Sequence, residues 1–391
     1  MESLLVVIGL VLLVDVVVWH RVFVRALARA PVPAPPLARY PSITVIRPIR
    51  GLDVDAAENF RAALATSYPG EVETLFVFDD EEDAALPVVR EIVAEHRASG
   101  ARGSAEIMIS GTPPAGRTGK LHAMIAGTRR ARGTLIAFGD SDSRPAPELL
   151  TQLVEALFAA PDIGCTFAPV VVTDPPETIG DVGYALMLDG LYAPGVARAA
   201  GAAGRLPFIM GQLMVFRPEA LAAIGGPECA DGQLVDDMYI GRCVARAGYA
   251  NVMINAPLVI TNRGTTLRRF LENYRRWMLF GQGGIPMQTT WPLWLRGLNA
   301  WLATALLVIA LVDGAVWPAL IALGVLVAHG ESSVRLHRRH GGAPVALRLR
   351  WFAATLFLLA PFVVASMAWR RVDWRGRAYS LGGPAAAPLA R

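Results

Sequence analysis

The sequence predicts an α/β domain with a largely parallel sheet, flanked at both ends of the chain by membrane-spanning helices. Of the 391 residues, 53% are hydrophobic and 18% are charged, and this charged share lies below the usual quarter of a soluble domain. The longest apolar runs lie at the two ends, and the mixed region of roughly 230 residues between them is long enough for one domain. In that region β-branched strands alternate with helices, which indicates parallel strands and a ligand cleft at their carboxyl ends.

Residues 1–30 are predicted to form a membrane anchor. The run Leu4–Trp19 is apolar except for Asp15, which we expect to face another helix. Basic residues follow the run, namely His20, Arg21, Arg25 and Arg29. A secretory signal has its basic residues before the apolar run, so this order favours an uncleaved anchor with the next part of the chain in the cytoplasm. About 16 apolar residues are short for a membrane span, which leaves a core helix as the alternative.

The proline-rich residues 31–41 predict a stiff, semi-extended spacer, and residues 42–265 are assigned to the α/β domain. In its first half, short β-branched and aromatic runs alternate with segments of helical apolar spacing. The expected strands are Ile43–Ile46, Thr74–Phe78, Ala105–Ile109 and Leu135–Phe138. The expected helices are Ala56–Thr66, Leu86–Ala98 and Lys120–Ala131.

The second half of this domain is less regular. Two apolar runs, Ile163–Val172 and Phe208–Phe216, are expected to be strands. Segments with helical spacing or helix-start signals are expected to be helices: Leu149–Ala159, Glu177–Ala200, Pro218–Ile224 and Asp236–Ala247. The helix Glu177–Ala200 has tyrosines, leucines and a methionine but few charges.

Residues 266–292 are predicted to form interfacial helices, because Leu267–Phe280 mixes apolar and basic positions with a tryptophan near its end. Residues 293–391 then form a C-terminal membrane region and tail. Its apolar stretches are Leu298–Val312, Ala315–Val327 and Trp351–Trp369. The basic residues between the second and third stretches are expected in the cytoplasm. Either a third crossing or a bend at Pro361, which returns the chain to the cytoplasmic face, can follow.

Several other kinds of site are not expected. Nucleic-acid binding is not expected, because the arginines flank the membrane segments and no aromatic-basic interleaving occurs. The three cysteines have no metal-ligand spacing and indicate buried thiols in a reducing compartment. Glycine-rich dinucleotide and P-loop motifs are missing from the sequence, and its six histidines are scattered, which disfavours a zinc site.

Acidic residues follow the expected strands and open one helix. Asp79 ends the second strand, and Asp140 and Asp142 follow the fourth. Two carboxylates two residues apart on a turn can reach one cation, and Mg²⁺ or Mn²⁺ prefers such ligands together with a diphosphate. A lone Asp-x-Asp is also common in turns, but its place at a strand end favours a metal site. The third acidic group is the pair Asp236 and Asp237.

The remaining candidates each have a structural and a functional interpretation. Asp236 and Asp237 can cap a helix, or one of them can act as a general base toward an incoming hydroxyl. Lys120, at a helix start, can meet a phosphate or lie in solvent. Arg276 and Trp277 can anchor the chain at a membrane surface, or they can neutralise a leaving phosphate and form an apolar wall for an acceptor.

In their order and spacing, these motifs resemble the ceramide glucosyltransferase family of membrane-bound, inverting glycosyltransferases over nearly the whole chain. The matching segments are Arg47-Pro-Ile-Arg-Gly51, Val77-Phe-Asp79 with Asp83, Gly139-Asp-Ser-Asp142, Val235-Asp-Asp237, Asn273-Tyr-Arg-Arg276-Trp277 and Asp373-Trp-Arg-Gly-Arg-Ala-Tyr379. The family has Gln or Arg where this chain has Asn273, and this difference puts the identity of the acceptor in question.

The resemblance implies a GT-A type, Rossmann-like domain that transfers a hexose from a UDP-sugar to a ceramide-like lipid hydroxyl with inversion. It implies Asp237 as the catalytic base, and Asp140 and Asp142 as ligands of Mg²⁺ or Mn²⁺. The implied donor contacts are Pro48, Asp79, Lys120 and Asp140. The implied acceptor and diphosphate contacts are Asp236, Arg276 and Trp277. The protein is then a multi-pass protein of a bacterial-type cell membrane, with its catalytic domain in the cytoplasm.

Three alternatives remain at this stage. The same chemistry can act on a hopanoid or a glycerolipid. A processive polysaccharide synthase is a second alternative, although such enzymes usually have more membrane helices. A membrane-anchored scaffold with a degenerate nucleotide cleft is the third, and it predicts no metal-dependent binding of a UDP-sugar. The identity of the sugar is not predicted by the sequence.

Overall fold

The structure is a computed structural model that describes residues 2–28, 34–284, 287–359, 365, 371–374 and 377–380. Contacts divide the chain into two compact units. The sheet unit comprises Ala30–Val170, Ala202–Thr261 and Arg370–Arg391, and the helical unit comprises Met1–Arg29, Val171–Gly201 and Asn262–Trp369. The range 42–265 expected for the α/β domain thus includes a segment, Val171–Gly201, that groups with the long apolar helices.

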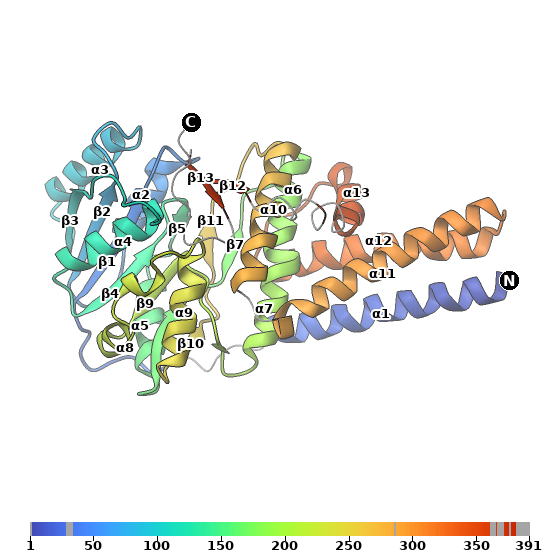
Figure 1. Ribbon diagram of the computed structural model, residues 1–391, viewed down its shortest axis with the longest axis horizontal. Helices are drawn as coiled ribbons and strands as arrows, with labels where there is room; N and C mark the ends of the chain where they lie inside the picture. The colour runs from blue at the N-terminus through green and yellow to red at the C-terminus, as the bar shows by residue number, and fades with distance from the viewer. Residues whose placement is uncertain are drawn as a thin grey trace. The chain divides into compact units, whose positions relative to one another are not determined.

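The sheet unit contains an eight-stranded sheet with the order β3-β2-β1-β4-β9-β6-β10-β8 (Figure 1). The strands are β1 (Ile43–Ile49), β2 (Val72–Phe78), β3 (Ser104–Ile109), β4 (Leu135–Gly139), β6 (Ile163–Phe167), β8 (Arg205–Leu206), β9 (Leu213–Phe216) and β10 (Ala250–Met253). β1 is parallel to both β2 and β4, β2 to β3, and β6 to β10. β9 runs antiparallel between β4 and β6. The predicted α/β class with a mostly parallel sheet is confirmed.

Helices pack on this sheet and place their first turns near the strand ends. They are α2 (Ala56–Leu64), α3 (Leu86–Ala98), α4 (Gly119–Arg130), α5 (Leu149–Phe158), α8 (Pro218–Ala223), η2 (Pro227–Ala230) and α9 (Asp236–Arg246). α4 begins after Thr118, whose hydroxyl accepts a hydrogen bond from the Leu121 amide at 3.1 Å. A Cβ on Gly127 of α4 would lie 2.6 Å from Ile46 on β1, so α4 seats closely on the central strand.

Two apolar clusters form the core of the sheet unit. One joins α5 to β1, β4 and β9 through fully buried side chains such as Leu153, Leu135 and Val215. The other joins α2 and α3 to β2 and includes Phe60 and Phe76. The strands β1, β2 and β4 are buried along most of their length, and the candidate site lies where these strands end.

Some predicted boundaries were wrong. The expected strand Ile163–Val172 is interrupted after β6 and resumes as β7 (Val170–Val172), because Pro169 offers no amide hydrogen to a neighbouring strand. The boundary between the two units falls within β7. The expected strand Phe208–Phe216 is strand only from Leu213. Two further short strands pair antiparallel, β5 (Ser143–Arg144) and β11 (Leu258–Ile260), and neither was predicted.

The helical unit contains the apolar helices. They are α1 (Glu2–Ala28), α6 (Ile179–Ala185), the π-helix η1 (Leu186–Tyr192), α7 (Ala193–Ala200), α10 (Leu267–Gly284), α11 (Met287–Val312), α12 (Val316–Arg339), α13 (Leu347–Thr355) and η3 (Leu356–Leu359). The predicted helix Glu177–Ala200 is therefore a helical run with a π-helical centre.

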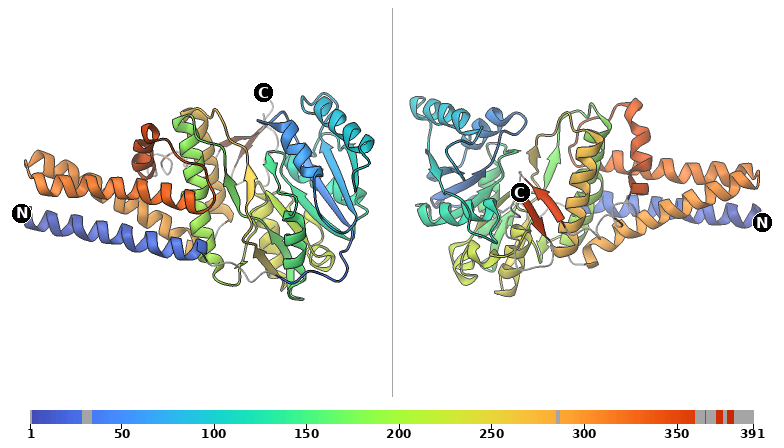
Figure 2. Two further views of the ribbon diagram at one scale, coloured as in Figure 1. Left: turned by 180° about the vertical axis from the view of Figure 1, so that it is seen from behind. Right: turned by 45° about the horizontal axis from the view of Figure 1, so that its top comes forward.

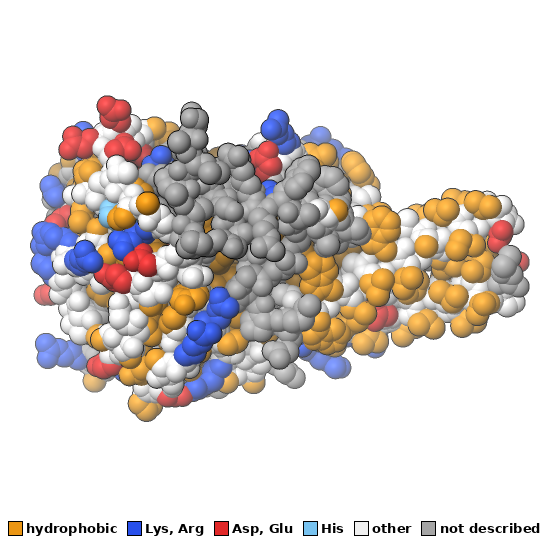
Figure 3. All heavy atoms as spheres, in the orientation of Figure 1, with side chains coloured by type: hydrophobic (Ala, Val, Ile, Leu, Met, Phe, Trp, Pro, Cys, Tyr) orange, Lys and Arg blue, Asp and Glu red, His pale blue; other side chains and the backbone are white. Residues whose placement is uncertain are grey.

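Three helices of the described residues are long and apolar enough to cross a membrane: Glu2–Ala28, Thr290–Val312 and Val316–Arg339. α1, α11 and α12 lie side by side (Figure 2), and hydrophobic side chains cover their visible surface (Figure 3). The last part of the third predicted stretch, including Pro361, lies outside the described residues, so a third crossing or a bend stays a prediction. In the tail, β12 (Arg371–Trp374) pairs antiparallel with β13 (Arg377–Ser380).

Polar side chains join the three long helices. The Asp15 Oδ2 atom on α1 accepts a hydrogen bond from Asn299 Nδ2 on α11 at 2.8 Å. The Asn299 Oδ1 atom lies 2.8 Å from His329 Nε2 on α12. The expectation that Asp15 faces another helix is confirmed.

Candidate active site

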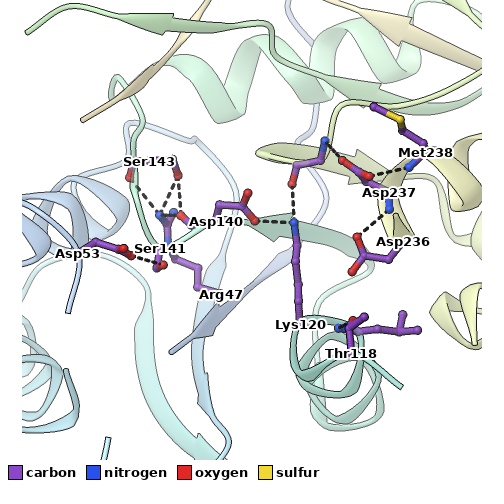
Figure 4. A network of polar contacts seen from close by, with 12 residues as sticks. Arg47, Asp53, Thr118, Lys120, Asp140, Ser141, Ser143, Asp236, Asp237 and Met238 are labelled. Carbon is purple, nitrogen blue, oxygen red and sulfur yellow. Dashed lines mark hydrogen bonds and ion pairs between the residues drawn. The ribbon is translucent and has the colours of Figure 1, made fainter. Parts of the chain in front are cut away.

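Lys120 lies between the predicted carboxylates of the sheet unit (Figure 4). From the first turn of α4 its Nζ atom lies 2.7 Å from Oδ1 of Asp140, the residue that follows β4. The same ammonium donates a hydrogen bond to the Gly211 carbonyl oxygen at 3.5 Å. Burial lowers the pKa of Lys120, but the nearby carboxylates of Asp140, Asp236 and Asp237 raise it by more, so the pKa lies above its usual value. The lysine is therefore a fixed positive charge at the centre of the site.

Asp236 and Asp237 open α9 opposite Asp140 (Figure 4). Asp236 Oδ1 accepts a hydrogen bond from the Asp237 amide at 2.8 Å, and Asp237 Oδ1 accepts one from the Met238 amide at 2.7 Å. Each carboxylate thus accepts from the amide that follows it, while the N-cap residue is Val235, which makes no side-chain cap hydrogen bond. Asp237 also reaches out of the helix, because its Oδ2 accepts a hydrogen bond from the amide of Gly211 at 2.7 Å.

Gly211 is a site residue that the sequence did not reveal. A Cβ at this position would lie 2.4 Å from Asp237 Cβ and 2.6 Å from Asp237 Oδ2, which is closer than real Cβ atoms approach. Only a glycine lets the backbone present its amide to the Asp237 carboxylate and its carbonyl to Lys120. The only local signal is a glycine after the apolar run Phe208–Met210, and that signal is not specific.

Burial changes the proton affinity of the acidic pair. It raises the pKa of Asp236 to about 6, a shift that Lys120 opposes and Asp237 increases. Burial also raises the pKa of Asp237, and Lys120 again opposes the shift. The Oδ2 atom of Asp236 is buried and has no hydrogen-bond partner among the described residues. A carboxyl group with raised pKa can take a proton near neutral pH, as a general base must.

Arg47 holds the turn that carries the Asp140-Ser-Asp142 motif. It lies on β1 and is 1% exposed. Its Nη2 atom donates hydrogen bonds to the carbonyl oxygen of Asp140, and to the carbonyl and hydroxyl oxygens of Ser143 at 3.1 and 3.0 Å. Burial lowers the pKa of Arg47 to about 10, and the carboxylates of Asp140 and Asp142 oppose the shift. The buried guanidinium of Arg47 therefore fixes the position of this turn.

The ends of β1 and β2 lie beside this turn. Asp79 follows β2, is 6% exposed, and lies 2.7 Å from Arg50 Nη1 through its Oδ2 atom. Pro48 pairs with Val77 in the parallel register of β1 and β2. From the loop after β1, Asp53 Oδ2 accepts a hydrogen bond from the Ser141 hydroxyl at 2.7 Å. This last contact joins the loop after β1 to the Asp140-Ser-Asp142 turn.

The acidic residues of the turn suit a divalent cation in part. Among the described residues no group of three or more His, Cys, Asp or Glu side chains is placed to hold a metal ion. Mg²⁺, however, is usually bound by one or two protein carboxylates together with substrate phosphates and water. Asp140 and Asp142 provide two such carboxylates on one turn, with Asp140 24% exposed, so these residues fit a cation that a diphosphate brings with it.

Arg276 and Trp277 belong to the other unit, on α10. There the Trp277 ring lies 5.8 Å from the ring of Tyr192, measured between centroids. Asn273, the position that departs from the family motif, is partly buried on the same helix. Their predicted contacts with a diphosphate and an acceptor stay predictions. The structure brings together Asp140, Lys120, Asp236 and Asp237, with Asp79, Asp142 and Pro48 at neighbouring strand ends.

Comparisons with known proteins show the family to which the chain belongs. The family model described as "Glycosyl transferase family 21" matches residues 4–386. Ceramide glucosyltransferases 3 and 1 of Caenorhabditis elegans are each 23% identical, over 241 and 249 residues. These matches cover 61% of this chain and 50% and 49% of the two relatives, so the chain spans about half the length of the curated relatives it matches.

A solved structure has the same fold. The mannosyltransferase PcManGT from Pyrobaculum calidifontis, solved with GDP-Man and Mn²⁺, superposes with a TM-score of 0.52 at 19% identity. The match covers 94% of this chain and 99% of the mannosyltransferase. This likeness confirms the predicted GT-A type fold.

Proposed function

Because the chain belongs to glycosyl transferase family 21, we propose that it transfers a hexose from a UDP-sugar to a membrane-lipid hydroxyl with inversion. The membership also confirms the family and the enzyme class expected from the sequence motifs. The observation that supports the proposal most strongly is the position of Lys120. It separates a carboxylate suited to a metal-bound diphosphate, Asp140, from an acidic pair suited to a base.

In the proposed reaction, Asp237 accepts the proton of the acceptor hydroxyl. The hydroxyl oxygen then forms a bond to the anomeric carbon while the bond from that carbon to the UDP oxygen breaks, and the electron pair leaves with UDP. The amide of Gly211 holds one oxygen of Asp237, and each carboxylate oxygen keeps a second lone pair for the proton. Lys120 offers a positive charge toward the leaving group, which stabilises the charge that develops there.

The donor binds at the strand ends in this proposal. Asp79 and Pro48 would contact the nucleotide, Lys120 and Asp140 would contact the diphosphate, and Asp140 with Asp142 would hold Mg²⁺ or Mn²⁺. When bound, this cation stabilises the negative charge of the departing diphosphate. Arg47 keeps the Asp140-Ser-Asp142 turn in place by its three hydrogen bonds.

The acceptor side of the proposal depends on the helical unit. Three apolar helices support a multi-pass membrane protein, with the sheet unit in the cytoplasm as the basic residues after α1 predict. A lipid acceptor then needs only to raise its hydroxyl from the bilayer surface. Asp236, Arg276 and Trp277 are assigned to the acceptor and diphosphate, and a ceramide-like lipid is the acceptor class that the curated relatives' names suggest.

To test this proposal, membranes that carry the full chain are incubated with a set of UDP-sugars, and the lipid products are identified by mass spectrometry. We expect a hexosylated lipid, and we expect chelation of divalent cations to abolish it. The product mass distinguishes a ceramide from a hopanoid or a glycerolipid. Absence of any metal-dependent glycolipid with every UDP-sugar would overturn the proposal.

Two matched variants assign the base. Asp237→Asn should lower kcat by about 1,000-fold, because general-base catalysis commonly contributes 10²–10⁴-fold. Asp236→Asn should have a smaller effect, because its neighbour keeps both the Gly211 amide and the proton-accepting oxygen. Equal rates for Asp237→Asn and the wild type would remove Asp237 from the role of base, and a reversed order would give the role to Asp236.

A further inference from the structure

The π-helix η1 interrupts an otherwise α-helical run in the helical unit, and all of its residues, Leu186–Tyr192, are buried. π-helical segments are rare and occur frequently at functional sites. The sequence of this segment contains one charged residue, Asp189, whose side chain is 0% exposed. A charge buried in a membrane-associated unit needs a partner, and that partner identifies what the segment is attached to.

The partner is His337, near the end of α12. Asp189 Oδ2 lies 2.8 Å from His337 Nδ1, and His337 is also 0% exposed. The same Oδ2 atom accepts a hydrogen bond from the Val172 amide at 3.0 Å. The other ring nitrogen, Nε2, lies 2.8 Å from the carbonyl oxygen of Ala343. Three segments of the chain are thus joined to η1 through one carboxylate and one imidazole.

This set of hydrogen bonds defines the proton count of the pair. The imidazole must donate from Nε2 to the Ala343 carbonyl, and Asp189 Oδ2 must accept from the Val172 amide. Both conditions hold when the pair shares one further proton on the line between Oδ2 and Nδ1. An asparagine at position 189 cannot reproduce the set with a neutral ring. Its amide oxygen could accept from both Nδ1 and the Val172 amide only if the imidazole were charged, and that buried charge would then have no carboxylate partner.

The residue after Asp189 shows how closely η1 packs on α12. A Cβ on Gly190 would lie 2.8 Å from the carbonyl oxygen of Ser333. Ser333 lies one helical turn before His337, so the ion pair and the close backbone approach lie on one side of α12. These two features together fix the position of η1 along that helix.

The last residue of η1 transmits this position to α10. The Tyr192 ring lies 5.8 Å from the Trp277 ring at an interplanar angle of 58°. Its hydroxyl donates a hydrogen bond to Met278 Sδ at 3.4 Å, and the side chain is 5% exposed. Trp277 is half of the Arg-Trp motif assigned above to the acceptor end of the reaction.

We infer that Asp189 and His337 are positioning residues for the lipid acceptor, which hold η1 on α12 so that Tyr192 supports Trp277 in the place where the acceptor docks. The inference rests on the proposed function, because it assigns a role to residues that support the acceptor motif. It extends that function to a pair of residues that lie outside every motif quoted for the family. Neither residue touches the reacting atoms, and their effect should therefore be selective for the acceptor.

The experiment compares the full-length protein in membranes with Asp189→Asn, His337→Ala and Tyr192→Leu. We expect each variant to raise the KM for the lipid acceptor about tenfold or more, with the KM for the UDP-sugar unchanged within a factor of about two. Tyr192→Leu leaves the ion pair of Asp189 and His337 in place, so it tests the connection to Trp277 even if the variants of these two residues fold poorly. Asn299→Leu is the matched control, since it removes a buried polar contact of the same unit that does not touch η1.

Hydrogen exchange provides a readout that does not need turnover. Asp189→Asn should increase amide exchange in Leu186–Tyr192 and in the first turns of α10, while Asn299→Leu should not. Unchanged exchange in these segments, or equal increases of KM for donor and acceptor, would overturn the inference. A wild-type protein that makes no glycolipid, with exchange that still changes as expected, would overturn the proposed function and the acceptor role but keep the mechanical connection.

Discussion

The polar side chains of the two units differ in how far a ligand can reach them. In the sheet unit, Lys120 at the start of α4 and Asp140 at the end of β4 form their ion pair with side chains 14% and 24% exposed. In the helical unit, Asp189 and His337 are 0% exposed, and the Asp15, Asn299 and His329 contacts run through the middle of apolar helices. The first set lies where a ligand can reach it, whereas the second set is enclosed within the protein.

This difference suggests how to separate chemistry from architecture in the molecule. A substitution in the sheet-unit site should change the reaction and leave unfolding nearly unaltered. A substitution among the buried polar contacts of the bundle should do the reverse, because a broken interhelical hydrogen bond costs stability and touches no substrate. Asp189 and His337 are the intermediate case, since their contacts lead through Tyr192 to the Arg-Trp motif.

After the loss expected for Asp237→Asn, the largest effect that would sharpen this comparison is expected from Gly211→Ala. The added methyl would lie 2.4 Å from Asp237 Cβ, so the carboxylate has to move away from its place beside Lys120. A displacement of about 1 Å in a catalytic group can cost on the order of 100-fold in rate, and we expect a loss of that size in kcat. The measurement is the initial rate of glycolipid formation at saturating donor and acceptor.

Gly195→Ala is the control for this substitution. Gly195 lies on α7, and a Cβ at this position meets no atom within 4 Å. Its rate should match that of the wild type. A Gly211→Ala enzyme with an unchanged rate would show that the contact between Gly211 and Asp237 has no part in catalysis.

The second expectation concerns pH and is of intermediate size. Burial raises the pKa of Asp237, and it raises the pKa of Asp236 to about 6. The base must be ionised to take a proton, so activity is present above the raised pKa of Asp237 and is lost as the pH falls through it. Below that pKa, kcat/KM should fall about tenfold per pH unit.

Asp236→Asn separates the two carboxylates in this profile. An acid limb that persists in the variant belongs to Asp237, in agreement with its assignment as the base. A limb that disappears from the variant, with activity retained at pH 5, would assign the titration to Asp236 and contradict that assignment. Asn299→Leu should keep the acid limb of the wild type, because both carboxylates remain in this variant.

The sheet-unit site was largely predictable because its residues obey local rules. Asp79 and Asp140 directly follow buried strands, and Lys120 and Asp236 lie in first turns of helices. Strand ends of a mostly parallel sheet meet at one edge, so residues far apart in sequence come together there. Gly211 escaped prediction because its role depends on a close approach of backbone to side chain, which no spacing in the sequence encodes.

The helical unit was less predictable in its details. Apolar content identified its long helices, and Asp15 was expected to face another helix. Its partner Asn299 lies on α11, 284 residues away, and neither apolar sequence indicates that the two residues pair. The π-helical form of η1 was not predicted either. Its hydrophobic sequence suits an α-helix equally well, and contacts with α12 hold it in place. Such tertiary contacts override local preference.

The smallest effect is expected from Asn299→Leu, and it bears directly on the contrast between the units. The Asn299 side chain donates hydrogen bonds to the Leu12 carbonyl oxygen at 3.1 Å and to Asp15, and faces His329 with its own oxygen. Polar contacts between membrane helices are worth about 0.6 kcal/mol on average, so we expect a loss of roughly 1 kcal/mol for this three-way contact.

Equilibrium unfolding of the purified protein in detergent measures this loss. Leu302→Ala is a matched control on the same helix, since Leu302 is 49% exposed on the bundle surface and its substitution should leave the free energy of unfolding unchanged. The kcat and both KM values of Asn299→Leu should stay at wild-type levels, because Asn299 holds helices together and does not contact the Arg-Trp motif. A variant that unfolds normally but loses acceptor affinity would place Asn299 on the acceptor path, and would end the separation of architecture from chemistry in the bundle.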